Sequence, residues 1–148
     1  YSPLANKYLE IISQKIKLFG GGILIIDYGY LDKNMKNTLQ SISKHRFNNV
    51  LNNFRKSDIT YGINFNLMQK IMKNFNLKIS GITSQKKFLT NIGILKRAEI
   101  ISKNLPFSKK ADIYFRVKRL IDENSMGGIF KVMFATNKNI KFQTGFEN

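Results

Sequence analysis

The sequence has no cysteine and no tryptophan, and it holds only two prolines and one histidine among its 148 residues. Without cysteine the chain can form no disulfide, ligate no iron–sulfur cluster and offer no nucleophilic thiol. A single histidine without cysteine also excludes the usual structural zinc sites, and we predict no metal site. No apolar run exceeds four residues. This is far short of the roughly 18 residues that cross a bilayer, so we predict no membrane span.

Acidic side chains are scarce, since nine Asp and Glu stand against 25 Lys and Arg, for a formal net charge of +16. Such an imbalance is typical of proteins with an anionic partner. The composition is also skewed towards 20 Ile over 3 Val, 20 Lys over 5 Arg, and 17 Asn, as an AT-rich genome would favour. This bias accounts for part of the lysine excess but not for the shortage of acids. One function class therefore stays open, a basic module that binds nucleic acid or an acidic protein surface.

The length and the residue pattern indicate one domain, or part of one, of the α/β class. Hydrophobic residues at 43% and charged residues at 23% are ordinary for a globular chain. The amino terminus shows no secretory signal and begins with Tyr1 rather than Met, so we expect a piece of a longer protein. Helical and strand-like patterns alternate along the chain, which favours an α/β fold.

The amino-terminal residues predict a helix followed by a buried strand. Ser2-Pro3 combines a capping hydroxyl with a proline at the first helical position, and apolar residues then recur with a helical period up to Phe19. The glycines from Gly20 to Gly22 end this helix. The continuous apolar run Ile23 to Ile26 is typical of a strand buried on both faces, as in a parallel sheet.

The remaining elements follow from caps and breakers. Residues 30–60 are irregular in pattern, with one short strand expected at Thr38–Ile42. Capping side chains and glycine or proline stops then delimit the later elements. These are a helix after Asn64, a strand at 77–80, a helix from Ser84 to near Gly93, a helix at 98–103, a helix from Ser108 that Gly127-Gly128 breaks, and a last strand at 129–135.

Asp27 and Tyr28 directly follow the predicted strand, at the end where open α/β sheets bind their ligands. A carboxylate there can accept hydrogen bonds from a ribose, an amine or a guanidinium. The alternative is that Asp27 only caps a turn and Tyr28 packs sideways. The glycines Gly20 to Gly22 are not expected to hold phosphate, because they follow a helix and precede a strand. No G-x-G-x-x-G or P-loop pattern occurs in the sequence.

The single histidine, His45, could act as a general base if Asp27 or Asp58 supplied a carboxylate partner. Its neighbours Lys44 and Arg46 oppose formation of the imidazolium, so a structural or solvated role is favoured for it. Asp58 lies in a sequence that is also typical of a simple turn.

A basic stretch near the end of the chain could form one face of a helix and meet phosphates. A solvated helix face is favoured instead, and no aromatic pattern of an RNA-binding module accompanies the cations, so we do not expect nucleic acid as a partner. The stretch contains Lys109, Lys110, Arg116, Lys118 and Arg119 against one carboxylate, Asp112.

Six groups of residues occur in the order found in one enzyme family. They are Ser2-Pro3, Gly21 to Gly29, Thr38-Leu39-Gln40 with His45, Asp58-Ile59-Thr60 with Phe65, Gln85 with Phe88-Leu89 and Gly93-Ile94, and Met126-Gly127 with Phe130-Lys131-Val132. Over residues 2–135 the sequence thereby resembles the carboxyl-terminal part of the MidA-like, S-adenosylmethionine-dependent methyltransferases. This is the family of the mitochondrial complex I assembly protein arginine methyltransferase.

The resemblance implies a fold and an incomplete catalytic domain. The fold would be α/β, the distal part of a Rossmann-like methyltransferase sheet with an inserted, largely helical region. Residues 1–148 would form a single incomplete domain, the carboxyl-terminal portion of a class I methyltransferase-like catalytic domain. In such enzymes a glycine-rich turn and an acidic residue hold S-adenosylmethionine, and both would lie upstream, in a missing amino-terminal half. We therefore expect this chain to be inactive by itself.

The resemblance also implies a substrate and a site. The whole enzyme would methylate an arginine of a protein substrate of the respiratory complex I type, in the cytoplasm of a bacterium or in the mitochondrial matrix. In this chain Asp27 is the first candidate to hold the guanidinium by bidentate hydrogen bonds, and Asp58 is the second. Relatives often carry an acidic residue or histidine at Gly62 and Asp at Asn64, so both positions lack a titratable group here. The implied catalytic residues are Asp27, Tyr28, His45 and Asp58, and the implied substrate-binding residues are Thr60 and Gln85.

Overall fold

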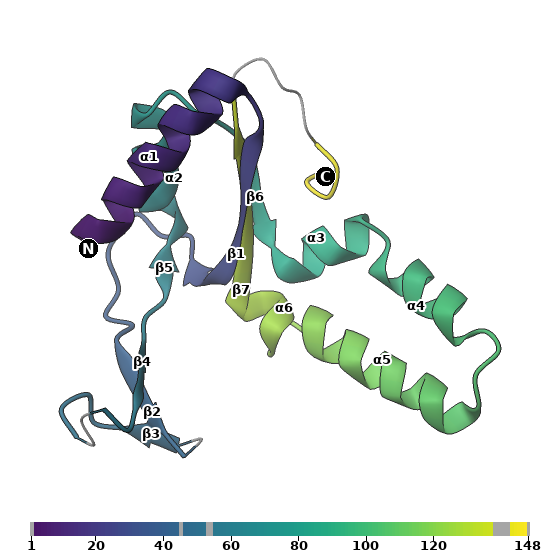
Figure 1. The fold of residues 1–148 in the computed structure, drawn as a ribbon. Coiled ribbons are helices and arrows are strands. Elements are labelled where there is room, and N and C mark those ends of the chain that lie inside the picture. Colours follow the sequence, from purple (N-terminus) through teal and green to yellow (C-terminus); the bar gives the residue numbers. More distant parts are fainter. Residues whose placement is uncertain (1, 45, 53–54, 138–142, 148) are drawn as a thin grey trace.

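The computed structural model describes residues 2–44, 46–52, 55–137 and 143–147 (Figure 1). Its main body contains α1 (Pro3–Phe19), β1 (Gly22–Tyr30), β5 (Ile63–Asn64), α2 (Phe65–Asn74), β6 (Lys78–Ser84) and β7 (Phe130–Thr136). A small sheet of β2 (Gln40–Ser43), β3 (Arg46–Asn48) and β4 (Asp58–Thr60) lies between β1 and β5 in the sequence. The helices α3 (Gln85–Asn91), α4 (Ile94–Ser102), α5 (Phe107–Ile121) and α6 (Met126–Ile129) connect β6 to β7.

Strand β1 lies inside a four-stranded mixed sheet with the order β5-β1-β7-β6. It pairs antiparallel with β7 along Gly22–Tyr28 and parallel with β5 only at Gly29 and Tyr30. The prediction of a strand buried on both faces of a parallel sheet is therefore wrong, since Leu24 and Ile26 each stay 45% exposed. The physical reason is that side chains alternate between the faces of a strand, while α1 and α2 pack on one face alone (Figure 1).

The core of the body lies between the sheet and the helices α1 and α2. Phe65 and Met72 of α2 and Met133 of β7 are fully buried there, and Ile16 of α1 packs against them. Helix α1 begins at its predicted cap, because the Ser2 Oγ accepts a backbone hydrogen bond in the first turn. The body therefore gathers side chains from both ends of the sequence into one core.

Residues 40–60 form a second, antiparallel sheet with the order β3-β2-β4. The prediction of irregular structure is wrong here, and the one expected strand, Thr38–Ile42, is found shifted to Gln40–Ser43. These strands have only three or four residues each. Their pairing supplies a regularity that such short segments do not signal in sequence. The small sheet extends away from the body, below β5 in the view of Figure 1.

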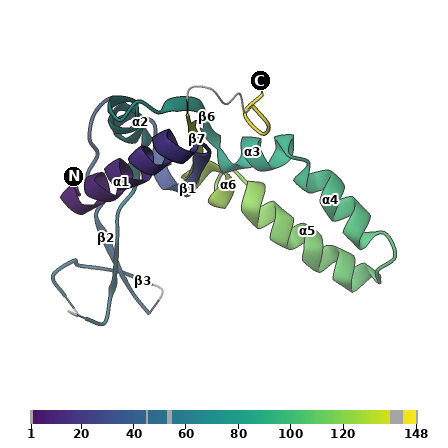
Figure 2. The same ribbon diagram turned by 45° about the horizontal axis from the view of Figure 1, so that its top comes forward.

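Helices α3 to α5 form an arm that projects away from the sheet, with α4 and α5 packed against each other (Figures 1 and 2). Helix α4 begins earlier than predicted, and α5 begins at Phe107, directly after the expected breaker Pro106. Gly127 and Gly128 do not end α5, which stops at Ile121, but lie within α6. Among helices in the described ranges, none combines the length and the hydropathy of a membrane-crossing segment.

Candidate functional site

A small cavity of about 180 Å³ lies at the carboxyl end of β1. It is bounded by this strand end, by β4 and by the residues that lead into β5, because the parallel pairing of β5 with β1 brings these segments together. Three of the six predicted site residues meet here, Asp27, Tyr28 and Thr60. The other lining residues are Ile59, Tyr61 and Ile63.

Asp27 is half-buried in this cavity wall. Its Oδ1 accepts a hydrogen bond from the backbone N–H of Tyr28 at 2.8 Å. The prediction that Asp27 and Tyr28 directly follow the strand is wrong, because pairing with β7 and β5 extends β1 to Tyr30. The bond to Tyr28 therefore caps no turn, and it occupies one of the two carboxylate oxygens. Among the described residues, no cation forms an ion pair with Asp27. A carboxylate offers about four acceptor sites, so Asp27 retains capacity for the donors of a ligand.

Lys131 is the residue directly opposite Asp27 in the β1–β7 pairing. Its ammonium group donates to the carbonyl oxygen of Gly128 rather than pairing with the carboxylate. Burial lowers the pKa of Lys131 below its ordinary value. Sequence reasoning did not place Lys131 in the site, although the residue stood inside one of the family motifs. The cation directly opposite on β7 thus forms no ion pair with Asp27.

Tyr28 and Thr60 differ in how firmly they are held. The Tyr28 ring packs edge-to-face on Phe130, with ring centroids 5.4 Å apart and an interplanar angle of 89°. This is the sideways packing of the alternative interpretation, and it fixes the ring while leaving it in the cavity wall. The Thr60 Oγ1 is buried and has no hydrogen-bond partner among the described residues. A buried hydroxyl without a partner is costly, but this oxygen has almost no accessible surface, so the cavity as it stands does not offer it to a ligand.

Two further predicted site residues, Asp58 and Gln85, do not line this cavity. Asp58 begins β4 on an exposed position. Gln85 is buried at the start of α3, where its side-chain amide donates to the Leu120 carbonyl at 2.9 Å and ties α3 to α5. This gives Gln85 a structural bond away from the strand end. His45 lies outside the described residues.

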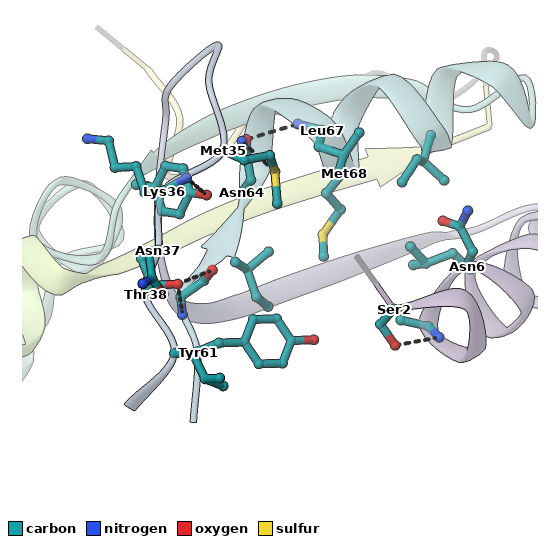
Figure 3. Close-up of a pocket in the computed structure, with 17 residues that line it drawn as sticks. Ser2, Asn6, Met35, Lys36, Asn37, Thr38, Tyr61, Asn64, Leu67 and Met68 are labelled. Atoms are coloured by element: carbon teal, nitrogen blue, oxygen red, sulfur yellow. Dashed lines mark hydrogen bonds between the residues drawn. The ribbon is translucent and has the colours of Figure 1, made fainter. Parts of the chain in front are cut away.

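A larger cavity of about 470 Å³ adjoins the first one and shares Tyr61 and Ile63 with it (Figure 3). It lies between the start of α1, the end of β1, the segment 35–39 and helix α2. Apolar side chains dominate its wall, which is typical of sites for small molecules or side chains. The other lining residues are Ser2, Ala5, Asn6, Leu9, Tyr30, Met35, Lys36, Asn37, Thr38, Leu39, Gly62, Asn64, Leu67, Met68 and Ile71.

The segment that closes the larger cavity is held at both ends. The Tyr30 hydroxyl accepts from the Lys36 N–H at 2.9 Å, and the Lys36 ammonium pairs with Asp32 at 3.0 Å. The Asn34 N–H and then Lys36 lower the pKa of Asp32. At the far end, the Thr38 Oγ1 accepts a hydrogen bond from the backbone N–H of Gly62 at 2.9 Å (Figure 3). Thr38 belonged to a family motif, whereas no sequence pattern pointed to Tyr30 as a wall residue.

The two departures from the family pattern have different consequences here. A Cβ on Gly62 would lie 3.6 Å from Thr38, which is ordinary contact, so the position has room for a side chain. Asn64 caps α2, because its Oδ1 accepts from the Leu67 N–H at 3.1 Å. Its amide also donates to the Asn34 carbonyl at 3.4 Å. Asn64 therefore keeps the capping role that an aspartate could fill, while Gly62 simply leaves space.

Comparison with known proteins decides the family. A sequence profile described as "putative S-adenosyl-L-methionine-dependent methyltransferase" matches residues 1–83, more than half of the chain. The chain belongs to this family. The match confirms the resemblance inferred from the motifs.

Curated relatives share about a quarter to a third of their residues with this chain. The protein arginine methyltransferase NDUFAF7, mitochondrial, of Xenopus tropicalis is 27% identical over 130 residues, covering 87% of this chain and 30% of the relative. The Homo sapiens protein of the same name is 27% identical over 144 residues, covering 97% and 32%. The Bos taurus protein is 31% identical over 99 residues, covering 67% and 22%. The chain thus spans about a third or less of the length of these relatives.

Two solved structures from Burkholderia thailandensis share the fold. One, an uncharacterised protein, superimposes with a TM-score of 0.86 at 22% identity, over 100% of this chain and 41% of that one. The other, bound to S-adenosyl-homocysteine, gives a TM-score of 0.72 at 23% identity, over 97% and 36%. These matches confirm the expected α/β methyltransferase fold class.

Proposed function

We propose that this chain is the substrate-side portion of a methyltransferase catalytic domain that methylates arginine in a protein. Residues 1–148 would then be the carboxyl-terminal part of one domain, completed by an amino-terminal half. The observation that carries the proposal is the half-buried Asp27, which forms no ion pair with any residue that the structure describes, in the cavity wall at the carboxyl end of β1. The names of the curated relatives, protein arginine methyltransferases, support the choice of acceptor.

Asp27 would bind and orient the substrate guanidinium. A guanidinium has five N–H donors in a plane, and a carboxylate can accept two of them in parallel. Such a pair fixes the direction of the reacting nitrogen and balances its positive charge. The Tyr28 ring, fixed by its contact with Phe130, would limit the positions open to the guanidinium. The adjoining apolar cavity offers surface for neighbouring parts of the peptide.

The methyl donor we propose for the complete enzyme is S-adenosylmethionine. The residues of this chain do not make a complete site for it, because the sequence has no G-x-G-x-x-G turn and its one triple glycine follows a helix. The donor would therefore be held mainly by residues outside this chain, and we expect these 148 residues to be inactive alone. A protein of the respiratory complex I type remains our proposed substrate, in the mitochondrial matrix or the bacterial cytoplasm.

The test is Asp27→Asn in the full-length enzyme that carries this segment. The amide keeps the shape of the side chain but loses the charge-assisted pair, which is worth roughly 1.5–3 kcal/mol for each hydrogen bond to a charged group. We expect the rate of peptide-arginine methylation to fall at least about tenfold with little change in melting temperature. The matched control is Asp58→Asn, which we expect to retain most activity because Asp58 is exposed and lies outside the cavity wall.

Three outcomes would contradict the role of Asp27. Near-normal methylation by Asp27→Asn would exclude it as the guanidinium clamp. A larger loss in Asp58→Asn would move that role to the second candidate. Lost activity together with a collapsed melting temperature would favour a structural interpretation, in which Asp27 only fixes the end of the strand.

A further inference from the structure

The arm formed by α3 to α5 ends in a tip that stands apart from the body, and we define this tip as residues 100–110. The arm is inserted between β6 and β7, and β6 is the edge strand opposite β5. Figures 1 and 2 both show α4 and α5 extending away from the sheet and from the small sheet of β2 to β4. The tip is thus remote from the candidate site at the carboxyl end of β1.

The tip carries apolar side chains that contact solvent. Phe107 is 86% exposed, although it is the first residue of α5 and has a large apolar ring. Ile100, Ile101 and Leu105 are also among the exposed large hydrophobic residues. Single exposed apolar residues are common on protein surfaces, but several at the end of one projecting hairpin indicate a surface that meets an apolar medium.

Cations lie close to these apolar side chains in the sequence. Lys103, Lys109 and Lys110 belong to the tip, which contains no acidic residue. None of the three forms an ion pair within the described ranges. Over residues 85–121 the arm has ten Lys and Arg against two carboxylates. Both carboxylates are already paired, Glu99 with Lys96 at 2.8 Å and Asp112 with Arg116 at 3.0 Å.

We propose that the tip of the arm docks on the surface of an anionic phospholipid membrane. Phe107, Leu105 and Ile101 would enter the boundary between headgroups and acyl chains, while the tip lysines meet the lipid phosphates. Apolar residues that insert and basic residues that meet anionic headgroups are the two signals that peripheral membrane binding combines. Nucleic acid would use the cations but would leave the aliphatic side chains of a convex tip without a partner.

The test uses the whole chain and two kinds of vesicle. One kind is pure phosphatidylcholine, and the other also contains about 30% phosphatidylglycerol to mimic an anionic leaflet. We expect sedimentation with the anionic vesicles and at least tenfold weaker binding to the neutral ones. Replacing Lys103, Lys109 and Lys110 by Gln should weaken binding to anionic vesicles at least tenfold. The matched control replaces Lys7, Lys17 and Lys70, three exposed lysines on α1 and α2, by Gln and should change binding less than threefold.

The absence of tryptophan from the sequence allows a direct test of insertion. The indole emission of Phe107→Trp should shift to the blue when anionic vesicles are added. The control is Phe19→Trp, at an equally exposed phenylalanine on α1, whose emission should stay in place.

Four results would overturn the proposal. These are no binding to anionic vesicles, an equal loss of binding in both triple-lysine variants, an unshifted Phe107→Trp on bound vesicles, or a dimer in solution that Phe107→Ser dissolves. Tight binding of a DNA duplex that the tip lysines control, without vesicle binding, would instead assign the tip to nucleic acid.

Discussion

The body and the arm of this protein differ in how many of their side chains are buried. In the body, Phe65, Met72 and Met133 are fully buried, although they come from strands and helices far apart in the sequence. In the arm, α5 buries no residue, α4 buries only Ala98 and Ser102, and α3, next to the sheet, buries Gln85 and Phe88. The body therefore depends on long-range packing, whereas the arm depends on local helix formation and a narrow contact between two helices. A surface under so little packing constraint can take up a binding role without disturbing the site.

The sharpest test of this difference is the same truncation made in both regions. Phe65→Ala should lower the free energy of unfolding by about 3–5 kcal/mol, because it removes a fully buried ring and leaves a cavity. Phe115→Ala on α5 should change it by no more than about 0.5 kcal/mol, since that ring is 71% exposed. Urea titration followed by circular dichroism measures both. Similar losses in the two variants would mean that the arm is packed as firmly as the body.

Two glycines offer a second, smaller contrast, because the same substitution would fail for different reasons. A Cβ on Gly29 would lie 2.2 Å from the Ile63 carbonyl oxygen and 2.8 Å from the Phe65 ring, so Gly29→Ala must push β5 away from β1. We expect it to cost about 1–3 kcal/mol through overpacking. Gly93, between α3 and α4, has φ +85° with nothing near its Cβ position, so Gly93→Ala costs about 1–2 kcal/mol of backbone strain alone.

Asparagine at the same two positions separates these causes. Asparagine tolerates the left-handed conformation better than alanine, so Gly93→Asn should recover part of the lost stability. Gly29→Asn should be worse than Gly29→Ala, because the larger side chain meets the same backbone oxygen. Thermal unfolding of the four variants decides the matter. A recovery by asparagine at Gly29 would show that conformation rather than close contact limits the end of β1.

Local rules predicted the helices well and the sheet poorly. Ser2, Asn64 and Ser84 each cap the helix that follows, as predicted, because a capping side chain acts on backbone N–H groups three residues away at most. The antiparallel pairing of β1 with β7 joins residues about a hundred positions apart, such as Gly22 and Thr136. The sequence of neither strand indicates which strand it pairs with. In the small sheet, β2 was predicted two residues too early, whereas β3 and β4 were missed because three residues are too few to show a pattern.

The sequence predicted some residues of the candidate site but not how they lie relative to one another. Asp27 and Thr60 stood in family motifs, but their meeting in one cavity depends on the parallel pairing of β5 with β1. Within the described part of the chain, the Thr60 hydroxyl has no partner and Lys131 donates to Gly128, and both are properties of three-dimensional packing. Gln85 shows the opposite case, since its motif position suggested substrate binding while its amide is engaged with Leu120 inside the arm.

The smallest expected effect concerns a cation of the body, Lys131, which is partly buried opposite Asp27. Burial lowers its pKa below 10.5, so between the lowered value and 10.5 the unfolded chain binds more protons than the folded one. Stability should therefore rise with pH through this window, because the penalty on the buried ammonium disappears as it deprotonates. Lys131→Met and Lys131→Arg both abolish this titration. The methionine side chain is neutral, whereas the arginine side chain stays positively charged. The free energy of unfolding, measured from pH 8 to 10.5, should therefore rise more steeply with pH for the original chain than for either variant. Parallel curves for all three proteins would show that Lys131 is as well solvated as the lysines of the arm.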